Sequence, residues 1–166
     1  MAADPEPVGV DATAVHDVDP DAGATVGAAS WPASLLGGAV RPLTLDRFVD
    51  DRGTLTPLVL AELSFAVARV FVVSAPAGAV RGGHAHRSVR QVLFRASGSV
   101  EVEFRHRGES SRLTLDDARP AVLVEAGVWA QQTYLDDGST LIVLADGGYD
   151  RSEYLDHDHG TDGDAS

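Results

Sequence analysis

The sequence predicts an all-β protein folded as a single double-stranded β-helix, that is, a jelly-roll barrel. Three observations lead to this prediction. Short β-branched runs recur roughly every 8–12 residues, with Gly- or Pro-containing turns between them. Residues 100–105 alternate strictly between apolar and charged side chains, which is typical of a strand with one buried face. No segment of the central region repeats apolar residues at the helical period of about 3.6 over three turns.

The apolar runs fix the expected strands. These are residues 66–73, 91–95, 100–105, 111–115, 121–124 and 140–145. The run 66–73 is β-branched and almost continuously apolar, so we expect it to be a central strand, buried on both faces. The Ser97-Gly98 pair provides the turn between two neighbouring strands. Many short strands without a helical segment favour a barrel or sandwich over an α/β fold.

Composition divides the chain of 166 residues into one domain and two tails. Residues 1–38 contain six acidic residues and no Lys or Arg, and they are rich in Ala, Gly, Asp and Pro, so we expect a disordered acidic tail. Residues 39–155 form the expected barrel domain. Residues 156–166 are expected to be a second disordered acidic tail, in which His157 and His159 are solvated rather than metal-bound.

Charge and residue usage exclude several classes of partner. The net charge is -12 and all 13 cations are arginines, so the chain lacks the basic footprint that nucleic acid requires. No apolar run approaches the roughly 20 residues of a membrane span. The chain has no cysteine, which excludes disulfides and thiolate metal sites, and its start lacks the features of a secretory signal. We therefore expect a cytoplasmic protein without nucleic-acid or membrane partners.

The strongest chemical signal is the segment Arg81-Gly82-Gly83-His84-Ala85-His86. Residues at positions i and i+2 of a strand share one face, so His84 and His86 should project together. Glycines within a strand bring the backbone close to a neighbour or a ligand, and this favours an inward-facing pair. A pair packed in the structure or lying on the surface is the alternative.

The wider spacing matches the first cupin motif. The matching residues are Gly78, His84, His86, Gln91 and Gly98. Metal-binding cupins usually have Glu where this chain has Gln91, and their second motif places His where this chain has Ala130. The remaining donors are two imidazoles and one amide, whereas divalent sites generally need three or more protein donors. We therefore expect no metal and no cofactor, and assign the two histidines to proton transfer.

Further landmarks along the chain resemble one family of cupins. They are Asp50–Gly53, Arg69–Phe71, Arg81–His86, Gly127–Trp129 and Tyr149–Tyr154. Together they cover residues 41–156 and resemble the nucleotide-sugar 3,4-ketoisomerases, the WxcM-like cupins that act on dTDP-4-keto-6-deoxyglucose. The chain departs from the family at Phe71 and Val72, where tyrosine is frequent, and at Ala130, where histidine is frequent.

The resemblance implies a metal-independent isomerisation through an enediol, in which His84 and His86 are the catalytic base and acid. Spacing does not determine which histidine is the base. Four residues are candidates for substrate binding: Arg81, Gln91, Arg52 and Trp129. Arg81 is expected at the enediolate or the diphosphate, whereas packing or structural roles are equally consistent with Gln91 and Trp129. Tyr149 and Tyr154 are expected to close one end of the barrel.

The resemblance also implies partners. The expected ligand is a dTDP-linked keto-deoxysugar, and the expected assembly is a homodimer that exchanges its N-terminal strand. Three other functions stay open from the residues alone: an epimerase of keto sugar nucleotides, a metal-dependent cupin dioxygenase, and a sugar-binding cupin without catalytic activity. The position of the product's ketone separates the first from an isomerase, and a stoichiometric metal ion would favour the second.

Overall fold

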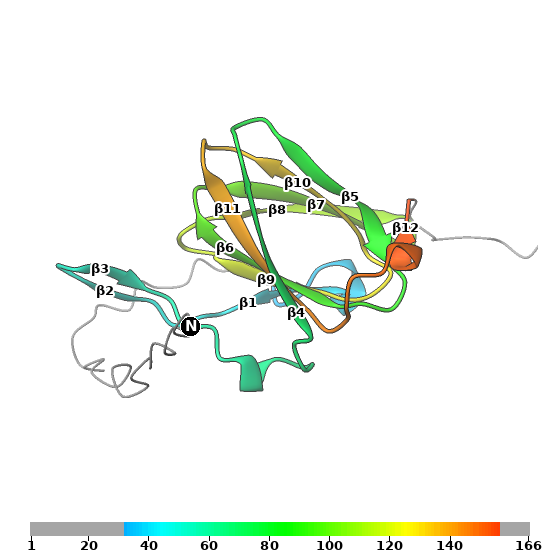
Figure 1. Cartoon of the computed structure of the whole chain (residues 1–166), viewed down its shortest axis with the longest axis horizontal. Helices are drawn as coiled ribbons and strands as arrows, with labels where there is room; N and C mark the ends of the chain where they lie inside the picture. The colour runs from blue at the N-terminus through cyan, green and yellow to red at the C-terminus, as the bar shows by residue number, and fades with distance from the viewer. Residues whose placement is uncertain (1–31, 157–166) are drawn as a thin grey trace, which may run out of the picture.

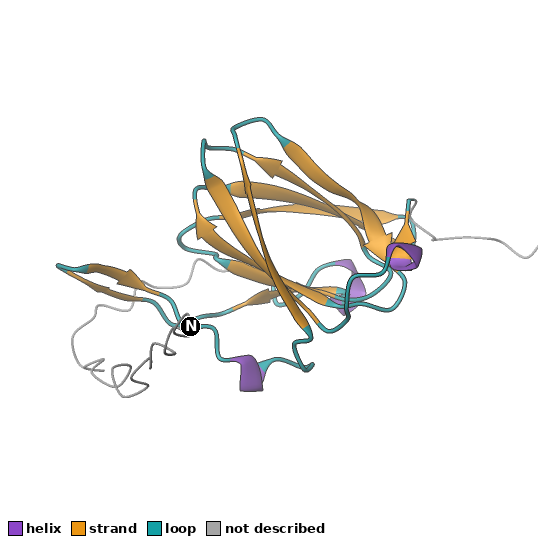
Figure 2. Cartoon of the chain, in the orientation of Figure 1, coloured by secondary structure: helices purple, strands orange, loops and turns teal. Residues whose placement is uncertain are grey.

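The computed structural model describes residues 32–156, which form a jelly-roll barrel of antiparallel strands (Figure 1). Most of residues 1–38 and 156–166, the two predicted tails, lie outside the described residues, and so do His157 and His159. Only three short 3-10 turns accompany the strands in the described chain (Figure 2). These are η2 (Leu36–Gly38), η3 (Leu60–Glu62) and η4 (Arg151–Glu153). The predicted all-β jelly roll is confirmed.

Two five-stranded sheets face each other. The first contains, in spatial order, β1 (Val40–Leu43), β9 (Ala121–Val124), β6 (Gln91–Ser97), β11 (Ser139–Ala145) and β4 (Arg69–Ala75). The second contains β12 (Tyr154–Leu155), β5 (Val80–His86), β10 (Trp129–Tyr134), β7 (Val100–His106) and β8 (Glu109–Leu115). A separate hairpin of β2 (Phe48–Asp50) and β3 (Gly53–Leu55) projects away from the barrel (Figure 1).

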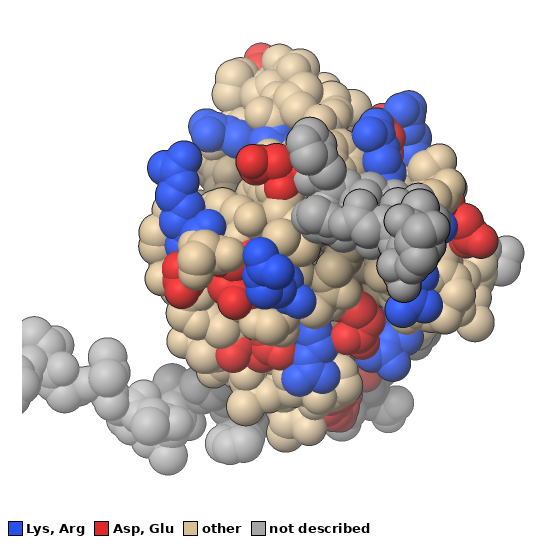
Figure 3. All heavy atoms as spheres, turned by 90° about the vertical axis from the view of Figure 1, so that its right-hand side faces the viewer, with Lys and Arg blue, Asp and Glu red and all other residues tan. Residues whose placement is uncertain are grey.

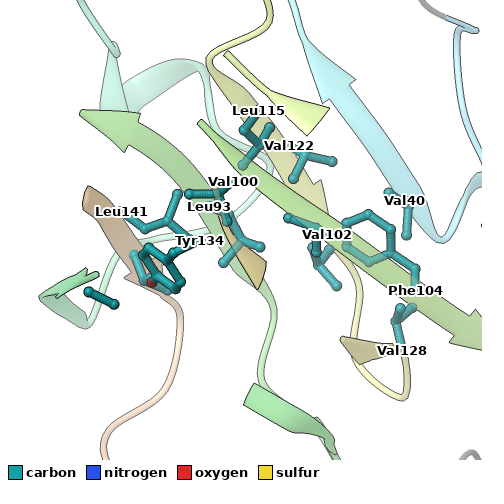
Figure 4. Close-up of a cluster of buried hydrophobic side chains, with 13 residues drawn as sticks. Val40, Leu93, Val100, Val102, Phe104, Leu115, Val122, Val128, Tyr134 and Leu141 are labelled. Carbon is teal, nitrogen blue, oxygen red and sulfur yellow. The ribbon is translucent and has the colours of Figure 1, made fainter. Parts of the chain in front are cut away.

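The core lies between the sheets, and strand alternation fills it. On β7, Val100, Val102 and Phe104 are 0% exposed, as the alternating sequence predicts. They pack with inward-facing residues of the opposite sheet, including Leu93 and Leu141 (Figure 4). The intervening charged residues of β7 therefore face outward.

A second apolar cluster covers the outer face of the first sheet. Phe65, together with the partly buried Leu58 and Leu63, packs against Leu123 and Leu144. All four residues of β9 are consequently buried, because both faces of that strand are covered. The runs 121–124 and 140–145, expected as strands, form β9 and β11 of this covered sheet.

The prediction for residues 66–73 is wrong in its position. The strand β4 forms the edge of the first sheet, and its residues alternate between the barrel and solvent. Val70 and Val72 are 55% and 63% exposed. β-branched composition shows that a segment suits a strand, but it does not show how many neighbours the strand has.

The ordered barrel begins before the predicted end of the N-terminal acidic tail. The prediction ends it at residue 38, whereas the backbone of Leu35 already pairs with Val40, through N–O distances of 2.8 and 3.2 Å in the two directions. Leu35 and Leu36 pack against the core. The glycine-rich composition of the segment conceals this, since Gly37 and Gly38 form a turn with positive φ angles.

The surface carries mixed charge. On the face drawn in Figure 3, arginine and carboxylate side chains are interspersed. Arg112 and Glu103, for example, form an ion pair of 2.9 Å on the outer face of the second sheet. Among residues 32–156, no helix is both long and apolar enough to cross a membrane.

The turn at Gly98 provides a test of the barrel's packing. Its φ is +64°, and a Cβ atom there would lie 2.7 Å from Cα of the buried Ser139. We expect Gly98→Ala to lower the free energy of unfolding by about 3 kcal/mol, from backbone strain plus the clash. Gly138→Ala is the control, because its φ is +74° but no atom lies within 4 Å of the added Cβ; it should cost only about 1 kcal/mol. Equal losses in urea denaturation would contradict this packing.

Candidate active site

A cavity of about 480 Å³ lies between the two sheets. Its walls come from inward-facing residues of β4, β5, β6, β10 and β11, and Tyr149 and Tyr154 of the C-terminal segment line it too. The side chains of Leu93, Leu141 and Val143 are buried and form its enclosed part. The rim includes the exposed residues Arg81 and Tyr149.

A β-bulge in β5 determines which side chains reach this cavity. Opposite β10, His84 pairs with Ala130 and Arg81 pairs with Gln132. Between these two pairs, β5 advances by three residues and β10 by two, so β5 contains one extra residue. Gly82 and Gly83, which lie at this bulge, both have positive φ angles. In a regular strand, positions 81 and 84 would face opposite sides. The bulge changes the phase, so Arg81 lines the same cavity as the histidine pair.

The bulge requires glycine at position 82. A Cβ atom on Gly82 would lie 2.7 Å from the backbone oxygen of Ala130 and 2.8 Å from the Gln132 side chain. The φ of +74° would also strain any other residue. The glycine predicted to allow close backbone approach therefore lets β5 approach β10.

His84 and His86 face the cavity together, as the i, i+2 spacing predicts. Their ring centroids are 5.1 Å apart. Tyr154 stacks on His84 at 4.3 Å with an interplanar angle of 28°, and it meets His86 edge-on at 5.0 Å. One tyrosine ring therefore covers both imidazoles at this end of the cavity.

A short C-terminal latch holds Tyr154 in place. The Glu153 carboxylate accepts hydrogen bonds from the Ser88 backbone N–H at 2.8 Å and from the Ser88 hydroxyl at 2.7 Å. The Glu153 carbonyl accepts one from the Arg87 N–H at 2.8 Å. Tyr154 then pairs with His86 across β12 and β5. The expectation that this tyrosine closes one end of the barrel agrees with the geometry.

Gln91 orients His86. The amide Nε2 of Gln91 lies 2.9 Å from the imidazole Nε2 of His86, so the amide donates to that nitrogen when the histidine carries its proton on Nδ1. Burial lowers the pKa of His86 to about 4, and the nearby charges of His84 and Arg69 act in the same direction, whereas Glu153 opposes them. His86 is therefore a neutral imidazole near pH 7.

Arg69 is a cavity residue that the sequence analysis missed as a functional candidate. It lines the cavity from β4, with its guanidinium carbon 4.9 Å from the Phe71 ring centroid and 5.7 Å from that of Tyr149. Neither Arg69 nor Arg81 forms an ion pair with an acidic side chain within residues 32–156. Two guanidinium groups without carboxylate partners make the cavity suited to an anion. Arg69 could have been predicted from the sequence by its spacing. It lies two and four residues before Phe71 and Val73, which also face the cavity.

Two predicted substrate-binding residues lie outside the cavity of their own chain. Trp129 is buried beneath Arg105, whose guanidinium carbon is 4.4 Å from the ring centroid, because it alternates with the inward-facing Ala130. Arg52 lies on the β2–β3 hairpin, with its side chain 84% exposed and 2.6 Å from Asp50. A stacking role for Trp129 in this cavity is thus not supported by its position.

The side chains at the three positions that depart from the family pattern do not all point into the cavity. Phe71 and Ala130 line the cavity, whereas Val72 faces solvent. The two imidazoles and the Gln91 amide meet in the cavity, and the Glu125 carboxylate that also lines it is paired with Arg41 at 2.7 Å. Within the described chain, no group of three His, Cys, Asp or Glu side chains is arranged to hold a metal ion.

A family profile described as FdtA: WxcM-like, C-terminal matches residues 39–160. A curated relative from Aneurinibacillus thermoaerophilus, named TDP-4-oxo-6-deoxy-alpha-D-glucose-3,4-oxoisomerase, is 27% identical over 115 residues. That alignment covers 68% of this chain and 83% of the relative.

Solved structures share the fold. QdtA, a sugar 3,4-ketoisomerase from Thermoanaerobacterium thermosaccharolyticum in complex with TDP, has a TM-score of 0.66 at 26% identity, covering 72% of this chain and 88% of that chain. The TDP-quinovose 3,4-ketoisomerase WlaRB from Campylobacter jejuni has a TM-score of 0.64 at 27% identity, with coverages of 71% and 92%. The rmlC epimerase from Mycobacterium tuberculosis, at 23% identity and a TM-score of 0.65, covers 73% of this chain and 70% of that chain and shares the fold alone.

The electrostatics of the histidine pair can be tested by NMR. Arg69→Met should raise the pKa of His86, because it removes one of the positive charges that disfavour the imidazolium. Arg105→Met is the matched control, since that cation lies over Trp129 outside the cavity and should leave the His86 titration unchanged. An unaltered His86 pKa in Arg69→Met would exclude the electrostatic contact.

Proposed function

The chain belongs to the FdtA family of WxcM-like, C-terminal domains, and on this basis we propose that it is a sugar-nucleotide 3,4-ketoisomerase. The proposed reaction converts dTDP-4-keto-6-deoxyglucose into a dTDP-3-keto-6-deoxyhexose. The observation that carries the proposal is one cavity in which His84 and His86 lie beside the unneutralised cations Arg69 and Arg81. The substrate's diphosphate provides the negative charge that such cations bind.

The chemistry needs only proton transfers. A neutral imidazole removes the proton from C3 beside the C4 ketone, and the electron pair forms an enediolate with its charge on the C4 oxygen. The proton of the C3 hydroxyl is transferred to the C4 oxygen, either directly or through an imidazole that passes it on. Return of a proton to C4 then leaves the ketone at C3. No atom or electron is gained or lost overall, so the histidine pair suffices as base and acid.

We assign the base to His84. The Nε2 lone pair of His86 is engaged by the Gln91 amide, which fixes that ring as a neutral neighbour. His84 has one ring face against Tyr154 and forms no hydrogen bond to another described residue, so its nitrogens are available to the sugar. His86, Arg81 and Arg69 then surround the developing enediolate charge with donors and positive charge.

The proposal includes metal-independent catalysis without a cofactor, because Gln91 and not a third metal-binding side chain adjoins the two imidazoles, and the Glu125 carboxylate that lines the cavity is paired with Arg41. It also retains the cytoplasmic location that the cysteine-free sequence predicts. Stoichiometric metal in protein purified without chelator would contradict the first of these, and would favour the dioxygenase alternative instead.

A homodimer is the proposed assembly. Val70 and Val72 expose apolar surface on the edge strand β4, and Val49 and Leu55 do so on the projecting hairpin. Edge strands with apolar side chains pair readily with another chain. A second copy would cover both surfaces. Arg52 sits at the tip of the hairpin, so a substrate-binding role for it requires that the hairpin reach the cavity of that copy.

The proposed activity is tested with dTDP-4-keto-6-deoxyglucose in D₂O. We expect a 3-keto product that carries deuterium at C4, observed by NMR. His84→Asn should lower kcat by about 10²–10⁴-fold with little change in folding, because it removes the base. His106→Asn, outside the cavity, is the control and should keep wild-type turnover. Folded wild-type protein that gives neither product nor exchange would exclude the proposal, and exchange with the ketone still at C4 would indicate an epimerase.

The assembly is tested by analytical ultracentrifugation at micromolar concentration. We expect wild-type dimers, and we expect the double substitution V70D/V72D to give monomers, because it places charges in an apolar interface. Ser110→Asp on the edge strand β8 is the control and should remain dimeric. Monomeric wild-type protein would exclude this part of the proposal.

A further inference from the structure

One polar group in the cavity wall has no role in the proposed proton transfers. Tyr134 is 0% exposed, and its hydroxyl has no hydrogen-bond partner in the described structure. Leaving a buried hydroxyl unpaired costs about 1–3 kcal/mol. Arg69 Nε is likewise buried without a partner, and it lines the same cavity. Two unsatisfied donors line this cavity, Arg69 from the first sheet and Tyr134 from the second, and they indicate that the bound ligand supplies the acceptors.

The backbone fixes Tyr134 on the inner wall. β10 alternates, so that Ala130, Gln132 and Tyr134 all line the cavity. Tyr134 is also tied to the turn that leads into β5, because its N–H donates to Ala79 at 2.9 Å and its carbonyl accepts from Gly78 at 2.7 Å. The backbone at Tyr134 is thus held in place, and its ring is fully buried in the core cluster, away from solvent.

The neighbours of the hydroxyl define the chemistry of what it binds. Burial raises the pKa of Tyr134, and the nearby positive charge of Arg81 opposes that shift with a smaller effect. The phenol consequently stays protonated and donates. Gln132 pairs with Arg81 and lies two residues before Tyr134 on β10, and no hydrogen bond to its side chain occurs in the described chain, so it is able to rearrange around a ligand. The wall thus presents donors to a neutral or partly negative oxygen.

The cavity is more enclosed near Tyr134 than at its rim, and this difference indicates that the sugar, and not the nucleotide, lies next to Tyr134. Tyr134 adjoins the enclosed part formed by Leu93, Leu141 and Val143, whereas Arg81 and Tyr149 lie at the exposed rim. A diphosphate is strongly hydrated and loses least by staying at the rim, beside arginine. The uncharged hexose is the part of a nucleotide sugar that can enter the enclosed part without that desolvation cost.

We propose that Tyr134 is a specificity-determining residue, whose hydroxyl donates a hydrogen bond to an oxygen of the hexose ring or its substituents. The identity of the ligand as a nucleotide-linked hexose rests on the proposed function. The hydroxyl is left unpaired in the free protein and gains its partner on binding. A substitution that removes it should therefore affect stability and affinity in opposite directions.

Tyr134→Phe tests this, because it keeps the ring and removes only the hydroxyl. We expect the Tm of the unliganded protein to rise by roughly 2–5 °C, since a buried unpaired group is lost. The affinity for dTDP-6-deoxyglucose, a non-reactive alcohol analogue, should fall about 10-fold by calorimetry, whereas the affinity for dTDP should stay within about twofold. Tyr149→Phe is the stability control, because that side chain is 69% exposed and its hydroxyl is solvated.

Three results would overturn the inference. A lower Tm in Tyr134→Phe would mean that the hydroxyl is already bonded within the fold. Unchanged affinity for dTDP-6-deoxyglucose would mean that the sugar does not reach it, and equal loss for dTDP would assign the contact to the nucleotide. A wild-type protein that binds dTDP-6-deoxyglucose but does not isomerise the 4-keto sugar would contradict the proposed function and leave this inference standing.

Discussion

Strand β5 carries one residue more than β10 between Arg81 and His84, and the rest of the site depends on how that residue is absorbed. The extra residue is accommodated by positive φ angles at Gly82 and Gly83. Because Gly82 has no Cβ, the carbonyl of Ala130 can approach it closely. Without the bulge, a strand's period of two would turn Arg81 away from the histidines. Chemistry therefore depends on a backbone irregularity of one residue.

Polar side chains on the outer surface of the barrel and in its cavity differ in whether they have partners. On the outer surface, several cations are neutralised by neighbouring carboxylates, as in the pairs that Arg90 and Arg112 form with Asp146 and Glu103. In the cavity, the partly buried Arg69 and the rim residue Arg81 form no ion pair with an acidic side chain of residues 32–156, and the buried Tyr134 hydroxyl is unpaired there. Unpaired polar groups in an enclosed space cost stability, which a ligand of complementary charge restores. The same contrast explains why the cavity is suited to an anionic nucleotide sugar.

The histidine pair is held from two sides. Gln91 on β6 fixes His86 through one hydrogen bond, and the latch between Glu153 and Ser88 holds Tyr154 over both rings. The first sheet and the C-terminal segment thus constrain side chains that belong to the second sheet. Pre-positioned imidazoles reduce the orientational cost of each proton transfer, because the rings need not be ordered when the substrate arrives.

Local pattern by itself determined the jelly-roll class, the alternation of β7, and a histidine pair with Gln91 near it, since each follows from the period of a strand or from spacing within one segment. Tertiary structure decided the rest. Arg69 joins the site because β4 is an edge strand whose inward positions start at that residue, whereas Trp129 is excluded because Ala130 takes the inward position. Arg52 lies on a hairpin that leaves its own barrel. Which face of a strand turns inward, and which distant strand lies opposite, depends on pairing between segments far apart in sequence, and no local pattern contains that information.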